Sequence, residues 1–445
     1  MRHLQPPDTV LAIASQLERA GYETWCVGGA IRDALLGHPH LDWDLATSAT
    51  PTQMREVFGA RRWIPVGVDF GTVGVLDREG KMHEVTTFRR DVKTDGRHAE
   101  VEFGVSLDDD LARRDFTINA IAFSPSTAEI RDPFGGQADL ERKVVRAVGD
   151  PDARMREDRL RALRAIRFAA RFGFAIEEST LRAVDSSAPH LGRLSRERVK
   201  QELDKTMEQV SAPSVAFELW RSSGAFASLL PPLAGLEPFA LRAPDCLPMP
   251  GRVARPARRS LRFAALLSSL TTREAAAVMA SLKSSRVEAQ LVESLVDKWR
   301  RYGGEMRRSL AEGPPSDSQV RKWVAAIGRL DVGAFMRLAA GLWAAARRDN
   351  KDAPSAAEVR RLYRRMRISA GRDPIDVGGL AIDGDDLRRA GIPAGRSLGM
   401  ILRALLDIVI ADPTRNSADF LLNEAQRQHE LLVGNSAARP DREET

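Results

Sequence analysis

The chain is poor in cysteine and histidine. Of its 445 residues only two are cysteine, Cys26 and Cys246, and seven are histidine. Two cysteines cannot build a disulfide scaffold or a zinc site with several thiolate ligands, so we expect a reducing, cytoplasmic location. Beyond His190 the sequence has a single histidine, His429, which excludes a His-Asp metal site of the phosphohydrolase type in the C-terminal half.

Long apolar runs are also missing. No run reaches the roughly 18 residues that a membrane-spanning helix requires, and we expect no membrane association. Residues 1–8 have no apolar core of the kind found in signal peptides. Lys and Arg (67) slightly outnumber Asp and Glu (61), giving a net charge of +6. This mild surplus permits a polyanionic partner but does not by itself require one.

The character of the sequence changes along the chain. At roughly 100–200 residues per domain, the length allows about two to four domains. Up to about residue 140, short β-rich runs alternate with turns and short helical stretches; from about residue 150, helical spacing prevails. We therefore predict an α+β head followed by an all-helical remainder. Expected strands are 24–27, 63–68, 72–76, 83–88 and 117–123, and expected helices are 9–20, 154–171, 196–209, 286–301 and 356–366.

The densest chemistry lies between Val27 and Asp44. A predicted strand ends at Gly28-Gly29 and a short helix follows. Glycines let the backbone approach a phosphate closely, and the first N–H groups of a helix are unpaired. Arg32, one turn into that helix, would add a charged fork for phosphate oxygens. Taken alone, the glycine pair is equally well explained as a tight turn.

Asp42 and Asp44 strengthen the phosphate interpretation. Residues i and i+2 of a strand face the same side, and two adjacent carboxylates resist joint ionisation unless a cation lies between them. Such oxygen ligands suit Mg²⁺, which typically takes one or two carboxylates together with substrate phosphates. A solvated edge or turn is the alternative explanation. Glu84, on the strand expected at 83–88, is a third candidate carboxylate, although an exposed strand residue accounts for it as well.

A third signal is the charged stretch Glu157–Phe168. With helical spacing, Asp158, Arg161, Arg164, Arg167 and Arg171 share about half the helix circumference. A solvated face is the simpler interpretation, but two apolar side chains (Leu160 and Phe168) project into the same sector. Cytosine and adenine both place an amine donor beside a ring-nitrogen acceptor, which a carboxylate and a guanidinium complement. Uracil and guanine reverse this pattern, so the same pair would reject them.

Taken together, four ordered blocks resemble the bacterial class II CCA-adding enzymes, in the tRNA nucleotidyltransferase and poly(A) polymerase family. They are Gly28-Gly29 through Asp44, Arg113–Ala120, Asp132–Leu140 and Glu157–Phe168. The resemblance implies a polymerase-β-like head with a mixed sheet at 1–140, a helical neck at 141–210 that reads the base, and a helical body and tail at 211–445 that bind tRNA, with about the last 12 residues disordered.

The resemblance also implies a function and a set of site residues. The activity would be Mg²⁺-dependent addition of C, C and A to the 3′ end of tRNA from CTP and ATP. Asp42 and Asp44 would be catalytic and hold the metal. Asp158 and Arg161 would read the base, and Arg114 would contact the triphosphate, with Asp115 or Asn119 on the ribose. The nucleotide-binding residues would be Gly29, Arg32, Arg114, Asp158, Arg161, Arg164 and Arg167.

Three alternatives stay open. Bacterial poly(A) polymerases share the head motifs, but the segment Gly67–Val73 resembles the CCA-adding version. An enzyme that adds only A is compatible with the polar segment 89–103, expected to be a mobile loop needed for the switch from C to A. A noncatalytic RNA-binding protein is disfavoured because Asp42, Asp44, Asp158 and Arg161 are all present.

Two arginine clusters would bind tRNA phosphates. They are Arg252, Arg255, Arg258 and Arg259, and Arg360, Arg361, Arg364, Arg365 and Arg367.

Overall fold

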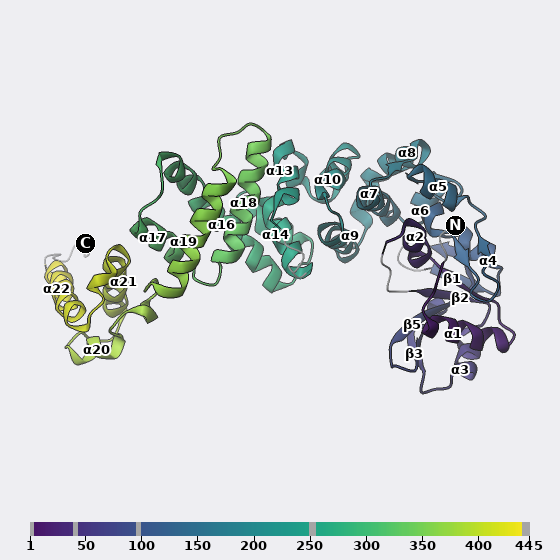
Figure 1. Cartoon of the computed structure of the whole chain (residues 1–445), viewed down its shortest axis with the longest axis horizontal. Coiled ribbons are helices and arrows are strands. Elements are labelled where there is room, and N and C mark those ends of the chain that lie inside the picture. The colour runs from purple at the N-terminus through teal and green to yellow at the C-terminus, as the bar shows by residue number, and fades with distance from the viewer. Residues whose placement is uncertain (1–3, 39–42, 95–98, 249–254, 438–445) are drawn as a thin grey trace, which may run out of the picture. The chain divides into compact units, whose positions relative to one another are not determined.

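The computed structural model describes residues 4–38, 43–94, 99–248 and 255–437. The chain forms two compact units, divided after Leu236, with Ser281–Lys283 belonging to the first. Figure 1 shows the main sheet in the purple-to-blue N-terminal part and helices in the green-to-yellow remainder. The predicted α+β fold class, a mixed-sheet head followed by helices, is confirmed. The proposed boundaries at 140 and 210 stay predictions.

A seven-stranded mixed sheet organises the head. Its strand order is β3-β4-β5-β2-β1-β8-β9, in which β2 and β5 pair in parallel and the other neighbours are antiparallel. Two further pairs, antiparallel β6–β7 and parallel β10–β11, stand apart. The strands are β1 (Thr24–Val27), β2 (Asp44–Thr47), β3 (Trp63–Gly67), β4 (Thr72–Leu76), β5 (Met82–Thr87), β6 (Arg89–Thr94), β7 (Ala99–Phe103), β8 (Ala122–Phe123), β9 (Ile130–Arg131), β10 (Val144–Val145) and β11 (Ala175–Ile176).

Helices cover this sheet and continue the first unit. The apolar residues Trp25 and Val27 of β1 pack in one buried cluster with Leu107 and Leu111, which fixes the helix of these leucines against the sheet. The helices are α1 (Asp8–Arg19), α2 (Gly29–Leu36), α3 (Pro51–Phe58), α4 (Leu107–Ala112), α5 (Gly136–Arg142), α6 (Pro151–Glu157), α7 (Leu160–Phe172), α8 (Glu178–Ser187), α9 (Arg196–Gln209), α10 (Pro213–Ser222), α11 (Ala225–Leu229) and α12 (Pro231–Ala234), with 3-10 turns η1 (Val68–Phe70), η2 (Thr117–Asn119) and η3 (Ala188–Arg193).

The second unit is helical throughout its described part. Its last helices have a core of their own, in which Leu387, Leu405 and Leu421 are fully buried. Among the described residues, no helix is long and apolar enough to cross a membrane. The helices are α13 (Pro238–Arg242), α14 (Arg255–Leu267), α15 (Thr272–Ser281), α16 (Arg286–Glu312), α17 (Asp317–Ile327), α18 (Val332–Arg348), α19 (Ala356–Arg372), α20 (Gly384–Arg389), α21 (Arg396–Ala411) and α22 (Ala418–Ala437), with 3-10 turns η4 (Ala243–Cys246), η5 (Val377–Gly379) and η6 (Pro413–Arg415).

One predicted strand is mostly wrong. Of residues 117–123, only Ala122–Phe123 form a strand, and Thr117–Asn119 form a 3-10 turn. The polar side chains explain the difference, because Thr117 donates to Asp139 at 2.8 Å and Asn119 donates to Asp115 at 2.8 Å. These bonds turn the backbone out of an extended path.

The single helix predicted at 154–171 is also wrong, because the chain breaks between α6 and α7. Asp158 is extended, with φ −147° and ψ 104°. Its carboxylate accepts a hydrogen bond from the backbone N–H of Leu160 at 3.0 Å, so it caps the start of α7. Asp158 therefore does not share a helix face with the arginines of α7.

The segment 89–103 contains strands where an irregular loop was expected. β6 and β7 pair antiparallel, and Arg90 lies opposite Glu102, which it contacts at 2.6 Å. The loop prediction rested on polarity, but opposite charges on facing positions also stabilise an exposed two-stranded ribbon. Residues 95–98, including His98, lie outside the described residues. At the C-terminus, α22 extends into the tail expected to be disordered, and residues 438–445 lie outside the described part.

Candidate active site

The double-glycine turn joins β1 to α2 in a conformation that requires glycine. Gly28 has φ +80°, a region that other residues rarely adopt. A Cβ at Gly28 would lie 3.2 Å from Nη1 of Arg114 and 3.8 Å from Oδ2 of Asp44. The missing side chain thus leaves open a space between a guanidinium and a carboxylate. The first N–H groups of a helix have no partners inside the helix, which is what an anion site requires.

The carboxylate of Asp44 stands beside this turn. Asp44 opens β2 and is aligned with Val27, the last residue of β1. In the parallel pair of β2 and β5, Leu45 is aligned with Val85, so Glu84 takes the position next to Asp44. Asp44 and Glu84 are both exposed, whereas the residues that follow them are buried. The two carboxylates therefore share one face of the sheet.

The donor atoms at this place fit a divalent cation. Carboxylate oxygens are the ligands that a hard divalent cation prefers in proteins, and they stand here beside an open glycine turn. Asp42, the second predicted metal ligand, lies outside the described residues. Within the described ranges, no group of three or more His, Cys, Asp or Glu side chains is arranged to hold a metal ion.

A cavity of about 540 Å³ opens next to the turn. Eight cationic side chains line it against three acidic ones, so the cavity favours an anionic ligand. Its volume lies within the range usual for small-molecule sites. Apart from Glu84, the described site residues predicted from the sequence for the head and neck all line this cavity. The lining comprises Gly28, Gly29, Arg32, Asp44, Arg113, Arg114, Asp115, Asn119, Asp158, Arg161, Arg164, Arg167, Phe168, Arg171, Lys205 and Gln209.

Arg113 and Arg114 are held by Asp110 at the end of α4. The carboxylate of Asp110 is 1% exposed and contacts the two guanidinium groups at 2.9 and 3.1 Å. Burial opposes its ionisation, but the attraction of both arginines outweighs this and lowers the pKa of Asp110. The buried Nε of Arg114 has no hydrogen-bond partner among the described residues. Asp110 thus holds the guanidinium of Arg114 beside the turn.

Asp115 holds two further residues of the cavity wall in place. It contacts Arg164 of α7 at 2.6 Å and accepts from Nδ2 of Asn119 at 2.8 Å. Burial raises the cost of its charge, but Arg164 and the Asn119 hydrogen bond hold the pKa of Asp115 below its usual value. Arg164 is therefore fixed at the cavity wall by a buried carboxylate.

Asp158 and Arg161 are both held in place by other groups. One carboxylate oxygen of Asp158 accepts from Leu160 N, and the other contacts Arg198 of α9 at 2.7 Å. Arg161 donates to Glu157 at 2.7 Å and to the backbone oxygen of Arg113 at 2.9 Å. The pair lies at the same cavity, but from the α6–α7 break and from α7 rather than from one helix.

Sequence reasoning missed the contribution of α9. Glu202 is 2% exposed and contacts Arg167 at 2.5 Å and Arg164 at 3.7 Å. The sequence did carry a signal, because a polar stripe with helical spacing runs along this helix. Nothing in the spacing shows that Glu202 is buried against α7. The stripe consists of Arg198, Glu202, Lys205 and Gln209.

The fold and cavity define the nucleotidyltransferase class, with a polymerase-type head. The family described as "Poly A polymerase head domain" matches residues 24–146, and the one described as "Probable RNA and SrmB- binding site of polymerase A" matches residues 173–236. The chain belongs to the CCA-adding enzyme family: it is 34% identical over 436 residues to the CCA-adding enzyme of Geobacillus kaustophilus, covering 96% of this chain and 99% of that one.

Solved structures agree with this assignment. The CCA-adding enzyme of Bacillus stearothermophilus in complex with CTP matches with a TM-score of 0.75 and 31% identity, covering 97% of this chain and all of the other. The Thermotoga maritima enzyme complexed with tRNA has the same fold, with a TM-score of 0.67 at 21% identity and 96% coverage of both chains.

Proposed function

We propose that this chain adds C, C and A to the 3′ end of tRNA, using CTP and ATP and releasing pyrophosphate. The observation that carries the proposal is the single cavity that joins the glycine turn and Asp44 to Asp158 and Arg161. Phosphate-binding and base-reading groups thus face one nucleotide-sized space. A member of the CCA-adding family with this cavity needs no nucleic-acid template, because fixed protein groups select the base.

The proposed reaction is attack of the tRNA 3′-hydroxyl on the α-phosphorus of the bound triphosphate, breaking the bond to the β-phosphate. Gly29 and Arg114 bind the phosphates through backbone N–H groups and a guanidinium. Asp42 and Asp44 would hold Mg²⁺, which when bound lowers the pKa of the attacking hydroxyl and neutralises phosphate charge. Positioning is the main task of the remaining residues.

In this proposal, residues of the helical neck select the base. Asp158 accepts from the exocyclic amine of C or A, and Arg161 donates to the neighbouring ring nitrogen. Arg164 and Arg167 complete the pocket, where they contact Asp115 and Glu202. Arg32 was predicted to bind the nucleotide as well, and it lines the same cavity.

We propose tRNA binding for one face of α19 in the second unit. Arg360, Arg364 and Arg367 line a hollow of about 490 Å³ with Tyr363 and Ile368, and none of the acidic side chains in the described part of the chain lines it. Arg365 of the same predicted cluster instead contacts Asp317 at 2.6 Å. In the other predicted cluster, Arg259 contacts Glu288 at 2.6 Å, and Arg252 lies outside the described residues. We also propose the cytoplasmic location that the low cysteine content led us to expect.

The test uses purified protein and tRNA transcripts that end before the tail, after the first C, or after the second C. Each transcript is incubated with Mg²⁺ and labelled CTP, ATP or both. The proposal predicts completion of all three transcripts and no extension beyond A. Addition of A alone, or of long A tracts, would instead identify the A-adding or poly(A) polymerase alternative, and no incorporation would leave an RNA-binding protein.

A further inference from the structure

A patch of exposed apolar side chains lies on three neighbouring strands of the head. Val66 of β3 and Met82 of β5 are 46% and 43% exposed. A Cβ at Gly74 of β4 would lie 2.6 Å from the sulfur of Met82 and 3.1 Å from Cγ2 of Val66, so the two side chains meet over this glycine. Single exposed apolar residues are common, but a group that meets on one face marks a binding surface. We call Val66, Gly74 and Met82 the apolar platform.

The apolar platform continues the sheet face that carries the carboxylates. Met82 precedes Glu84 by two residues on β5, so their side chains face the same side. Gly74 lies opposite Glu84 in the antiparallel pair of β4 and β5. Since Asp44 and Glu84 share one face of the sheet, the platform and both carboxylates form one continuous surface.

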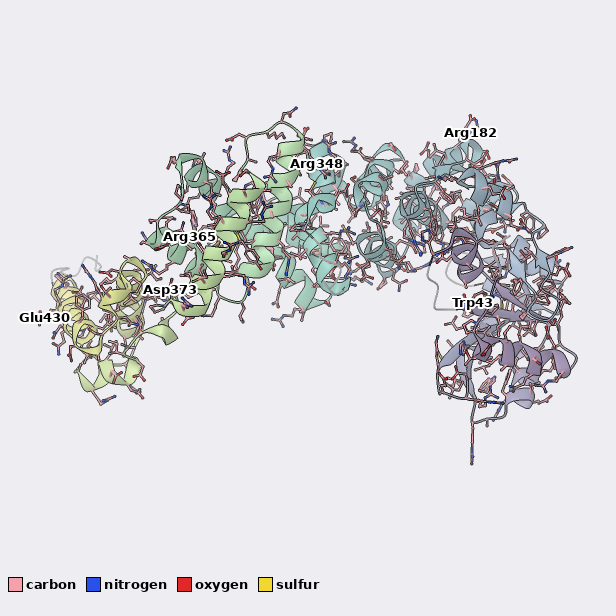
Figure 2. All side chains as sticks on the ribbon, viewed as in Figure 1. Trp43, Arg182, Arg348, Arg365, Asp373 and Glu430 are labelled. Atoms are coloured by element: carbon pink, nitrogen blue, oxygen red, sulfur yellow. The ribbon has the colours of Figure 1, made fainter. Side chains whose placement is uncertain are left out.

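Asp44 stands between this platform and the cavity. In the sheet, β2 lies between β5 and β1, and β1 leads into the glycine turn. Gly28 and Gly29 line the cavity, whereas no residue of β3, β4 or β5, all of which the structure describes, does so. Trp43, labelled in the head in Figure 2, and Leu45 are buried, so of these three consecutive residues only Asp44 is exposed beside both places.

The proposed reaction needs room on both sides of Asp44. The attacking and leaving oxygens lie roughly in line on opposite sides of the phosphorus that is transferred. With the triphosphate in the cavity, the side of β5 is left for the hydroxyl that attacks. The sugar and base that carry this hydroxyl then lie over β5 and β4, where Met82 and Val66 are exposed.

We propose that the apolar platform binds the terminal nucleotides of tRNA during each addition. This inference rests on the proposed function. The occupant changes at every step, because the tRNA ends first in its own last base, then in C and then in a second C. A flexible thioether makes favourable contacts with any aromatic ring, and contact with the face of a base does not depend on its identity. The platform therefore holds the end without reading it.

The first test measures KM and kcat with short RNA hairpins that carry only an acceptor stem and its single-stranded end, so that few other contacts contribute. The variants are Met82→Ser and Val66→Ser, and Met82→Phe replaces one apolar surface by another. The matched control is Val215→Ser on α10, because Val215 is 47% exposed. Titration calorimetry of CTP without RNA, on the same preparations, reports whether the nucleotide cavity is intact.

We expect each serine variant to raise KM for the hairpin by about two- to tenfold, with the Kd for CTP within about twofold of the unmodified protein. The rise should be equal for hairpins that end in A, G, C or U. Met82→Phe should restore KM, and Val215→Ser should change neither constant. An unchanged KM in both serine variants, an equal weakening of CTP and RNA, or an effect confined to one terminal base would overturn the inference.

A second test does not depend on turnover. A hairpin whose last nucleotide is 4-thiouridine is bound and irradiated, and the cross-linked peptide is identified by mass spectrometry. The inference predicts attachment to peptides of β3, β4 or β5, and attachment only elsewhere would contradict it. Failure of the unmodified protein to incorporate any nucleotide would contradict the proposed function instead, so the two failures are distinguishable.

Discussion

At the scale of single residues, the cavity is built from charges whose geometry other groups have already fixed. Asp158 is oriented by Leu160 N and Arg198, and Arg114 by Asp110. Groups held this way lose little freedom when a ligand binds, so in the proposed roles their hydrogen bonds would discriminate sharply between similar bases. Under the proposal, preorganisation of individual side chains lets a protein surface take the place of a template.

Replacement of Asp158 by Ala should therefore reduce discrimination more than turnover of the correct substrate. Losing one good base contact costs about 1–3 kcal/mol of discrimination, which corresponds to roughly tenfold or more. The measurement is kcat/KM for incorporation from CTP and from UTP on a transcript that lacks the tail. Asp185→Ala, at an exposed position of α8, serves as the control. Unchanged rejection of UTP by Asp158→Ala would show that another group reads the base.

At the scale of elements, regular patterns were predictable and interruptions were not. The bounds of α9 and of β4 agree with the expected 196–209 and 72–76. In both elements, the spacing of the apolar residues and the residues that mark the ends indicate the same limits. The break at Asp158 was missed, because its side-chain bond to Leu160 N overrides the helical spacing on both sides. The site residues on α2, on α7 and in the segment after α4 were predicted by motif, whereas Glu202 became visible only when α9 was packed against α7.

The N-terminus of α8 offers a test of such side-chain caps. Glu177 accepts from the backbone N–H of Thr180 at 2.8 Å and from the hydroxyl of Ser179 at 2.6 Å. Burial opposes its charge, but these hydrogen bonds lower the pKa of Glu177 to about 2. Because the folded-state pKa lies below the ordinary value of 4.5, the stabilisation is complete above pH 4.5 and is lost as the pH falls toward 2.

Glu177→Gln should accordingly lower the free energy of unfolding by about 1 kcal/mol at neutral pH. The difference from the unmodified protein should shrink between pH 4.5 and 3, since the carboxylate loses its advantage there. Urea unfolding followed by circular dichroism at several pH values measures it, with Glu178→Gln, whose side chain is 83% exposed, as control. A difference that stays constant with pH would contradict the charged cap.

At the scale of the whole molecule, the chemistry and the proposed grip on tRNA belong to different parts of the chain. The entire cavity lining comes from the first unit, and the arginine face of α19 belongs to the second. The similarity to a curated CCA-adding enzyme covers 96% of this chain and so includes both units. A change confined to the carboxylates proposed to bind the metal should therefore stop the reaction without releasing tRNA.

The most direct measurement is the initial rate of CMP incorporation by Asp44→Ala, taken with the Kd for tRNA on the same preparation. The account predicts a rate at least about a thousandfold lower and a Kd within about twofold of the unmodified protein, with Glu79→Ala, at an exposed turn, normal in both. Near-normal incorporation by Asp44→Ala would contradict the account.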